Sequence, residues 1–183
     1  MVQLRAFATL SIIALLHAAC LTDAPDDAPG TDEPSEPRTF EEAAERYAAA
    51  MCLTDFRAAA MAGAWELTTM YPHEAAYCSS CHGDGRDGFL APSYSFTDPV
   101  QRERAFFDGL KNNRAYLLDY VTPALDAAGK ITMVVNRAGL ASIAAGGLGH
   151  ERFVLEEEPG YPALLRFHAL TMQRLGSPCA SLQ

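Results

Sequence analysis

The chain has 183 residues, of which 49% are hydrophobic and 9% are aromatic. This length and composition favour one modest globular domain with tails over two domains. The formal net charge of −9 makes a polyanion such as nucleic acid an unfavourable partner, whereas basic partner proteins are compatible with it.

The first 19 residues have the features of an export signal. Arg5 precedes an apolar run over residues 6–16, which is too short to span a membrane as a helix, and small residues follow directly before Cys20. The segment LLHAAC resembles the end of a bacterial lipoprotein signal, although His17 stands where that pattern prefers leucine. We therefore expect a signal peptide over residues 1–19 and lipidation of Cys20, with ordinary signal-peptide cleavage nearby as the alternative.

Residues 20–38 are expected to form a disordered tether. They are rich in Pro, Asp and Glu, and Leu21 is the only large apolar residue before Phe40. Such a segment cannot bury enough apolar surface to offset the entropy lost on ordering. The folded domain is therefore expected over residues 39–183. Together with lipidation of Cys20, this tether predicts a domain anchored by lipid on the periplasmic side of a bacterial membrane.

Helical patterns dominate this folded region. Thr39 and Glu42 form a capping-box pattern that predicts a helix at its start. An apolar stripe predicts a second helix over residues 55–70. Further helices are expected near residues 99–110, 114–120, 124–128, 137–145 and 161–175.

Strand patterns are nearly absent from the sequence. No segment alternates evenly between apolar and polar residues, and only ITMVV, residues 131–135, is rich in β-formers. Residues 83–98 are rich in glycine and turn-forming residues and predict a loop. The predicted fold is all-α: a small, mainly helical domain with long loops.

The sequence CSSCH, residues 78–82, is the most specific motif of the chain. Cys78 and Cys81 have the spacing that lets two thiols bond the two vinyl groups along one edge of a haem. His82 follows directly and can ligate the iron as the proximal ligand. The motif therefore predicts covalently bound haem c.

Three other uses of CSSCH are weaker. A zinc site would need a second pair of ligands at similar spacing, and none of His73, His150 or His168 forms one with another Cys or His. A thioredoxin-like pair would open a helix after a strand, whereas this pair follows predicted helices. A plain local disulfide would leave His82 without a role.

The five cysteines can be assigned by role. If Cys20 is lipidated and Cys78 and Cys81 bind haem, Cys52 and Cys179 remain. In an oxidising compartment these two are a natural disulfide pair, which on the chain-entropy model would contribute on the order of 4 kcal/mol. Two buried free thiols are the alternative.

With these residues in view, the chain resembles the single-haem class I c-type cytochromes over about residues 55–175. Only CSSCH is specific to that family; the rest is likeness of architecture. The resemblance implies a close crossing between the helix before the motif and the last helix, for which Gly63 against Phe167 is the expected pair. Gly63 lies 15 residues before Cys78, further than is usual in the family.

The distal iron ligand is a separate question. The resemblance implies a ligand on the loop before the last helix, and His150 lies there in GGLGHERF, 68 residues after His82. Met133 is the alternative, although a methionine among β-branched residues is usually part of a core. A five-coordinate iron is a further alternative. The other candidates are less well placed: His73, His168 and Met172.

The resemblance implies electron transfer between redox partner proteins outside the cytoplasm rather than enzymatic catalysis. With both axial positions filled, the iron cannot bind a small molecule without losing a ligand. Two alternatives remain open. One is a haem-based sensor or peroxidase with an open distal site, and the other is a haem-free lipoprotein interaction module in which CSSCH is a disulfide.

Overall fold

The computed structural model describes residues 36–65, 78, 82–85, 88–93, 95–146, 152–177 and 179. These residues lie within one compact unit, Pro34–Gln183. The expected signal peptide, Cys20 and residues 21–35 of the expected tether lie outside the described residues. Among the helices that are described, none is both long and apolar enough to cross a membrane.

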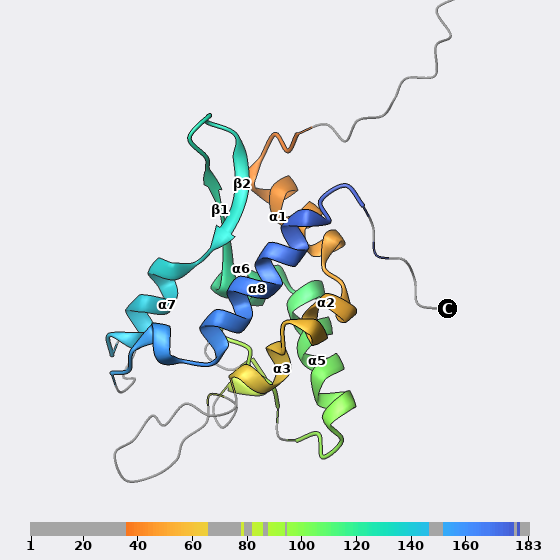
Figure 1. The fold of residues 1–183 in the computed structure, drawn as a ribbon, viewed down its shortest axis with the longest axis vertical. Coiled ribbons are helices and arrows are strands. Elements are labelled where there is room, and N and C mark those ends of the chain that lie inside the picture. Colours follow the sequence, from red (N-terminus) through yellow and green to blue (C-terminus); the bar gives the residue numbers. More distant parts are fainter. Residues whose placement is uncertain are drawn as a thin grey trace, which may run out of the picture. The chain divides into compact units, whose positions relative to one another are not determined.

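The described elements follow one another as shown in Figure 1. In chain order they are α1 (Phe40–Ala50), α2 (Leu53–Ala58), α3 (Met61–Ala64), α5 (Pro99–Asn112), α6 (Arg114–Tyr120), β1 (Val121–Leu125), β2 (Ile131–Val135), α7 (Arg137–Ala144), the 3-10 helix η3 (Leu155–Glu157) and α8 (Gly160–Gln173). The β1–β2 hairpin and α3 lie at opposite ends of the described fold, and α8 contacts both α3 and β2 (Figure 1).

The predicted starts of α1 and α5 are confirmed. The Thr39 hydroxyl accepts a hydrogen bond from the backbone N–H of Glu42 at 3.0 Å. The Asp98 carboxylate accepts one from the N–H of Val100 at 2.9 Å, and Pro99 occupies the first turn. Each side chain satisfies a backbone donor that has no partner within its own helix, so the local sequence fixes where these helices begin.

The prediction of one helix over residues 55–70 is wrong in its first half. The helix is interrupted between α2 and α3, where Ala60 adopts the left-handed conformation with φ of 60°. A left-handed alanine costs roughly 1–2 kcal/mol. The break leaves both Phe56 and Met61 fully buried, and this burial offsets that cost. Residues 66–70 lie outside the described residues.

The prediction of an all-α fold is also wrong, because β1 and β2 form a two-stranded antiparallel sheet. The register pairs Val121 with Val135 and Leu125 with Ile131. Residues 131–135 are the strand that their β-branched side chains indicated, whereas the helix expected over residues 124–128 does not exist.

The turn of the hairpin explains the error. The Asp126 carboxylate accepts hydrogen bonds from the backbone N–H groups of Ala128 and Lys130, at 2.8 and 3.0 Å. Gly129 has a φ of 76°, which glycine adopts without strain. In β1 only Val121 is fully buried, and Pro123 interrupts the strand pattern. No alternation of apolar and polar residues therefore marks β1 in the sequence.

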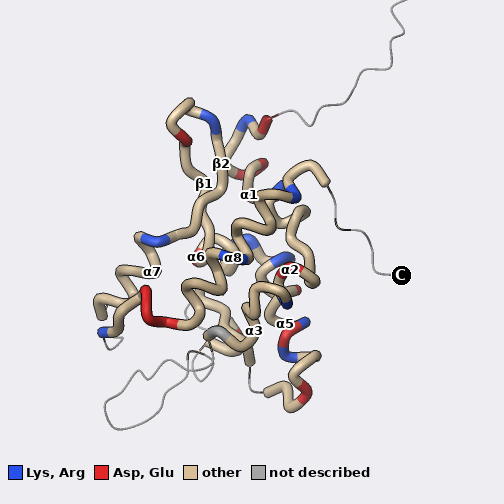
Figure 2. Tube along the Cα trace, in the orientation of Figure 1, with Lys and Arg blue, Asp and Glu red and all other residues tan. Residues whose placement is uncertain are grey.

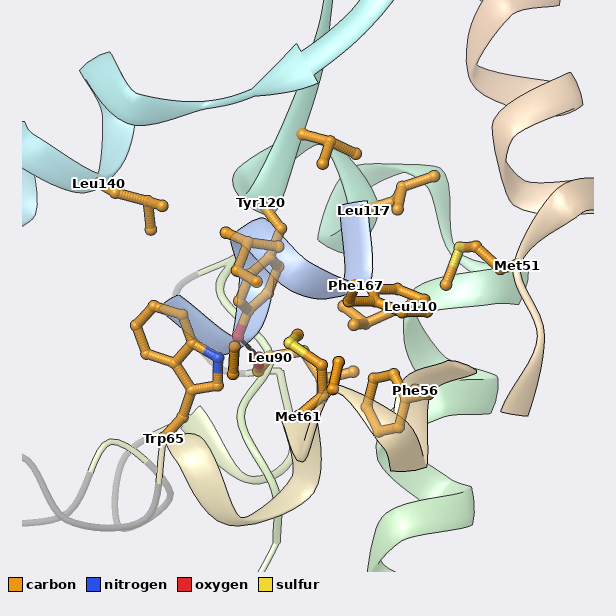
Figure 3. Packing of buried hydrophobic residues seen from close by; sticks show 14 of the residues in the cluster. Met51, Phe56, Met61, Trp65, Leu90, Leu110, Leu117, Tyr120, Leu140 and Phe167 are labelled. Atoms are coloured by element: carbon orange, nitrogen blue, oxygen red, sulfur yellow. Dashed lines mark hydrogen bonds between the residues drawn. The ribbon is translucent and has the colours of Figure 1, made fainter. Parts of the chain in front are cut away.

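The centre of the core is aromatic. Phe56 packs edge-on against three phenylalanines, with ring centroids 5.2–5.4 Å apart: Phe106 and Phe107 of α5 and Phe167 of α8. Edge-to-face geometry is the favourable arrangement for such rings. Figure 3 shows Phe56 and Phe167 together with Met51, Met61 and Leu110 in this region. These contacts join α2 to α5 and α8.

The residues that make the close contact with α8 differ from the expected pair, Gly63 and Phe167. A Cβ on Gly63 would meet nothing within 4 Å, so Gly63 does not pack against Phe167. A Cβ on Gly160, at the start of α8, would instead overlap the indole of Trp65. The glycine is therefore on α8 and the aromatic residue follows α3, the reverse of the expected arrangement.

Charged residues of both signs are interspersed along α1 and α5 (Figure 2). Arg46 pairs with Glu42 on α1, and Arg104 with Asp108 on α5. Exposed pairs of this kind each contribute roughly 0–1 kcal/mol. The neighbouring charges offset one another locally.

Candidate functional site

Two of the three residues predicted to attach haem are described. His82 is buried, with 7% of its surface exposed. Cys78 is half-buried and packs against the hydrophobic core cluster. Cys81 lies outside the described residues, as do His73 and His150.

An aromatic cluster lies beside His82. The Phe89 ring meets the His82 ring edge-on, with centroids 5.4 Å apart, and stacks on the Tyr120 ring at 4.8 Å. Trp65 meets Phe89 and Tyr120 edge-on, at 6.0 and 5.5 Å. Trp65, Phe89 and Tyr120 are called the aromatic wall below. They come from the end of α3, the loop after the motif and the end of α6.

The loop after His82 folds back onto the motif. The carbonyl oxygen of His82 accepts hydrogen bonds from the N–H of Gly85 at 3.1 Å and of Ala91 at 2.9 Å. The Tyr120 hydroxyl donates to the carbonyl oxygen of Leu90, a hydrogen bond between two residues that Figure 3 labels. Residues 89–91 of the expected loop are therefore held against α6 and against the backbone of His82.

Two buried polar atoms of the site have no hydrogen-bond partner among the described protein atoms: Trp65 Nε1 and Asp119 Oδ2. Burial raises the pKa of Asp119 to about 6, and the nearby His82 opposes this rise. Burial also raises the pKa of Tyr120 well above its ordinary value, with further contributions from Cys78 and Asp119. Cys78, His82 and Asp119 therefore lie near enough to one another or to Tyr120 to interact electrostatically.

Among the described residues no group of three His, Cys, Asp or Glu side chains could hold a metal ion. An iron held by a porphyrin needs only axial ligands from the protein, and His82 is of the right type. The aromatic wall supplies an apolar surface. Trp65 Nε1–H is a buried donor, and a haem brings two carboxylates that can accept from it. The described residues are therefore of the types that the proximal side of a haem requires: a buried histidine, apolar aromatic rings and a donor for a carboxylate.

Met133 lies away from this site. It is 3% exposed and lines a cavity of about 410 Å³, whose other walls come from residues 36–37, α1, the rest of the start of β2 and residues 174–177 after α8. The cavity is lined by Ala43, Arg46, Ala50, Ile131, Leu175 and others, none of them His or Cys. Strand β2 lies at the other end of the described fold from the segment around His82 (Figure 1). Met133 and His82 are not brought together.

His168 and Met172 have structural roles on α8. The Nδ1 atom of His168 lies 3.1 Å from the Tyr47 hydroxyl, and the two rings stack with centroids 5.6 Å apart. Burial lowers the pKa of His168. Met172 packs against the core cluster. Both side chains therefore tie α8 to the rest of the core.

The structure joins Cys52 and Cys179 in a disulfide, the pair expected from the cysteine count. Their Cα atoms are 5.7 Å apart, which is typical of this bond. The Cys179 sulfur also lies 3.2 Å from the carbonyl oxygen of Met51. The bond ties the segment after α8 to the connection between α1 and α2.

In comparisons with known proteins, no family model matches the chain, and no curated protein and no solved structure matches it.

Sequence reasoning missed the aromatic wall and Asp119. Trp65 is the chain's single tryptophan, but nothing in its neighbours indicates that it lies near His82. Phe89 falls in the expected loop of residues 83–98, and Asp119 and Tyr120 fall in the expected helix of residues 114–120; neither pattern indicates a role at the site. One signal in the sequence points to this cluster: a large aromatic residue such as Phe89 in a loop tends to be buried against other residues.

Proposed function

We propose that this protein is an exported, single-haem c-type cytochrome that carries electrons between redox partner proteins. The observation that supports this most is the position of His82. The histidine that ends CSSCH is buried beside an aromatic wall, and Cys78 packs at the edge of the same core. A histidine in a surface metal or disulfide motif would not need this environment.

The chain's own residues would do three things. The thiols of Cys78 and Cys81 would each add across a vinyl group: a carbon–sulfur bond forms, the S–H bond breaks and the hydrogen goes to the other vinyl carbon. This addition needs no oxidant or reductant. His82 would hold the iron from one side, and the aromatic wall would exclude water. When bound, haem supplies a one-electron couple.

His150 is the proposed distal ligand. Met133 lines a cavity at the other end of the fold, and His168 contacts Tyr47. His150 lies in the segment between α7 and α8, outside the described residues. Two axial histidines would leave the iron without an open position, which favours electron transfer over ligand binding.

The electron carrier is proposed to act on the periplasmic side of a bacterial membrane, where lipidation at Cys20 would anchor it. The segment LLHAAC and the acidic, Pro-rich residues 21–38 support this. Mass spectrometry of the mature chain tests the anchor. A mass matching a diacylated N-terminal Cys20 is expected, and an unmodified N-terminus would reject it.

Carbon monoxide binding tests the electron-carrier assignment. Reduced, haem-loaded protein should show no fast spectral change on addition of carbon monoxide, because both axial positions are filled. His150→Ala should bind carbon monoxide readily, whereas Met133→Leu, the matched control, should behave like the wild type. Fast binding by the wild type would favour a sensor or peroxidase with an open distal site.

A further inference from the structure

Asp119 is an acid at the candidate site that the proposed electron transfer does not use. It lies near the end of α6, and its Oδ2 atom is buried without a hydrogen-bond partner among the described protein atoms. A buried carboxylate oxygen that is left unpaired destabilises the folded protein, so its position calls for a partner.

Asp119 lies on a part of α6 that packs close to His82. The next residue, Tyr120, stacks on Phe89, and Phe89 meets the His82 ring edge-on. The end of α6 is therefore packed against the segment that carries His82. The two side chains are near enough for His82 to lower the pKa of Asp119 against the rise caused by burial.

A histidine that binds a metal through one ring nitrogen keeps an N–H on the other. That N–H almost always donates to a carboxylate, a backbone carbonyl or a water, and this bond fixes the ring and makes the ligand more basic. Asp119 is a half-buried residue near His82, and its buried Oδ2 atom has no hydrogen-bond partner among the described protein atoms.

We propose that the Asp119 carboxylate accepts a hydrogen bond from the ring N–H of His82 that faces away from the iron. Asp119 is then a positioning residue for the proximal ligand. This inference rests on the proposed haem function. A more basic His82 stabilises the ferric over the ferrous state, so Asp119 sets the reduction potential lower than it would otherwise be.

The test is the reduction potential of haem-loaded Asp119→Asn, measured by spectroscopic titration. We expect normal haem attachment and a potential higher than that of the wild type. The expected shift is roughly a tenfold change in the ratio of ferrous to ferric protein at fixed solution potential, or about 59 mV for one electron. Asp108→Asn is the matched control, because it removes the same charge from an exposed position on α5.

If the potential of Asp119→Asn moves no further than that of Asp108→Asn, the inference is wrong. A wild type that carries no haem would instead reject the proposed function, and the inference with it. If Asp119→Asn does not acquire haem, a measurement on the wild type replaces it. The ring N–H proton of His82 is then observed by NMR in the ferrous protein with labelled histidine. A downfield, slowly exchanging proton that is bonded to a carboxylate is expected, and a proton in fast exchange with water would overturn the inference.

Discussion

Trp65, a member of the aromatic wall, and Asp119, the neighbour of Tyr120 in the chain, each have one buried polar atom without a hydrogen-bond partner among the described protein atoms. In a protein without a ligand, each such atom destabilises the fold by about 1–3 kcal/mol. A haem carboxylate next to Trp65 and the His82 ring N–H donating to Asp119 would remove both penalties. If the proposed haem is bound, it would therefore raise the free energy of unfolding at these two residues.

The raised pKa of Asp119 predicts that the free energy of unfolding of the haem-free protein depends on pH. Its pKa is about 6 in the folded state, against 3.8 for the ordinary carboxyl. Between these values the folded state binds more protons than the unfolded state, so the free energy of unfolding falls as the pH rises from about 4 to about 6. Solvent reaches much of this side chain, which reduces the amplitude.

Urea denaturation of the haem-free protein at several pH values in this window measures the effect. Asp119→Asn should show a flatter profile than the wild type, because it has no carboxyl to titrate. If Asp119→Asn has the same dependence of the free energy of unfolding on pH as the wild type, groups other than Asp119 cause that dependence.

At the scale of elements, the sequence predicted what local signals determine. Thr39 and Asp98 cap helices through their own side chains, so the starts of α1 and α5 could be predicted. The break at Ala60 could not, because tertiary packing of Phe56 and Met61 overrides local helix propensity. The hairpin was missed because β1 lacks alternation.

The contact between α3 and α8 gives a matched pair of glycine variants. Gly160→Ala should lower the free energy of unfolding by roughly 1–3 kcal/mol, because the added methyl group overlaps the Trp65 indole. Gly63→Ala should raise it by roughly 0.5–1 kcal/mol, since the added methyl meets nothing within 4 Å and φ is not positive.

Urea midpoints of the two variants and the wild type measure this difference. Opposite shifts are expected. Shifts in the same direction for both variants would mean that the approach of α8 to Trp65 is looser than the structure indicates.

At the scale of the whole molecule, the disulfide spans most of the folded unit, with a sequence separation of 127 between Cys52 and Cys179. Closing a loop of this length stabilises the protein on the order of 4 kcal/mol, mainly by restricting the unfolded chain. A Cys52→Ser/Cys179→Ser variant should lose about that much in urea denaturation. A mild reductant should destabilise the wild type and leave the variant unchanged, and equal sensitivity of both would contradict the assignment.

The candidate site was predictable only where it is local in the sequence. Cys78, Cys81 and His82 are identified by their spacing within five residues. The aromatic wall joins residues from the end of α3, a loop and α6, and only tertiary packing brings these together. No sequence period links Trp65 to Tyr120, so this half of the site required the structure.

The proposed function requires that the chain binds haem covalently through CSSCH. A pyridine haemochrome assay on protein produced together with a cytochrome c maturation system measures this. We expect stoichiometric haem with the spectrum of two thioether bonds, and loss of covalent haem in a Cys78→Ala/Cys81→Ala variant that keeps the Cys52–Cys179 disulfide. A folded wild type without haem, with Cys78 and Cys81 joined in a disulfide, would contradict it and leave the lipoprotein interaction module as the function.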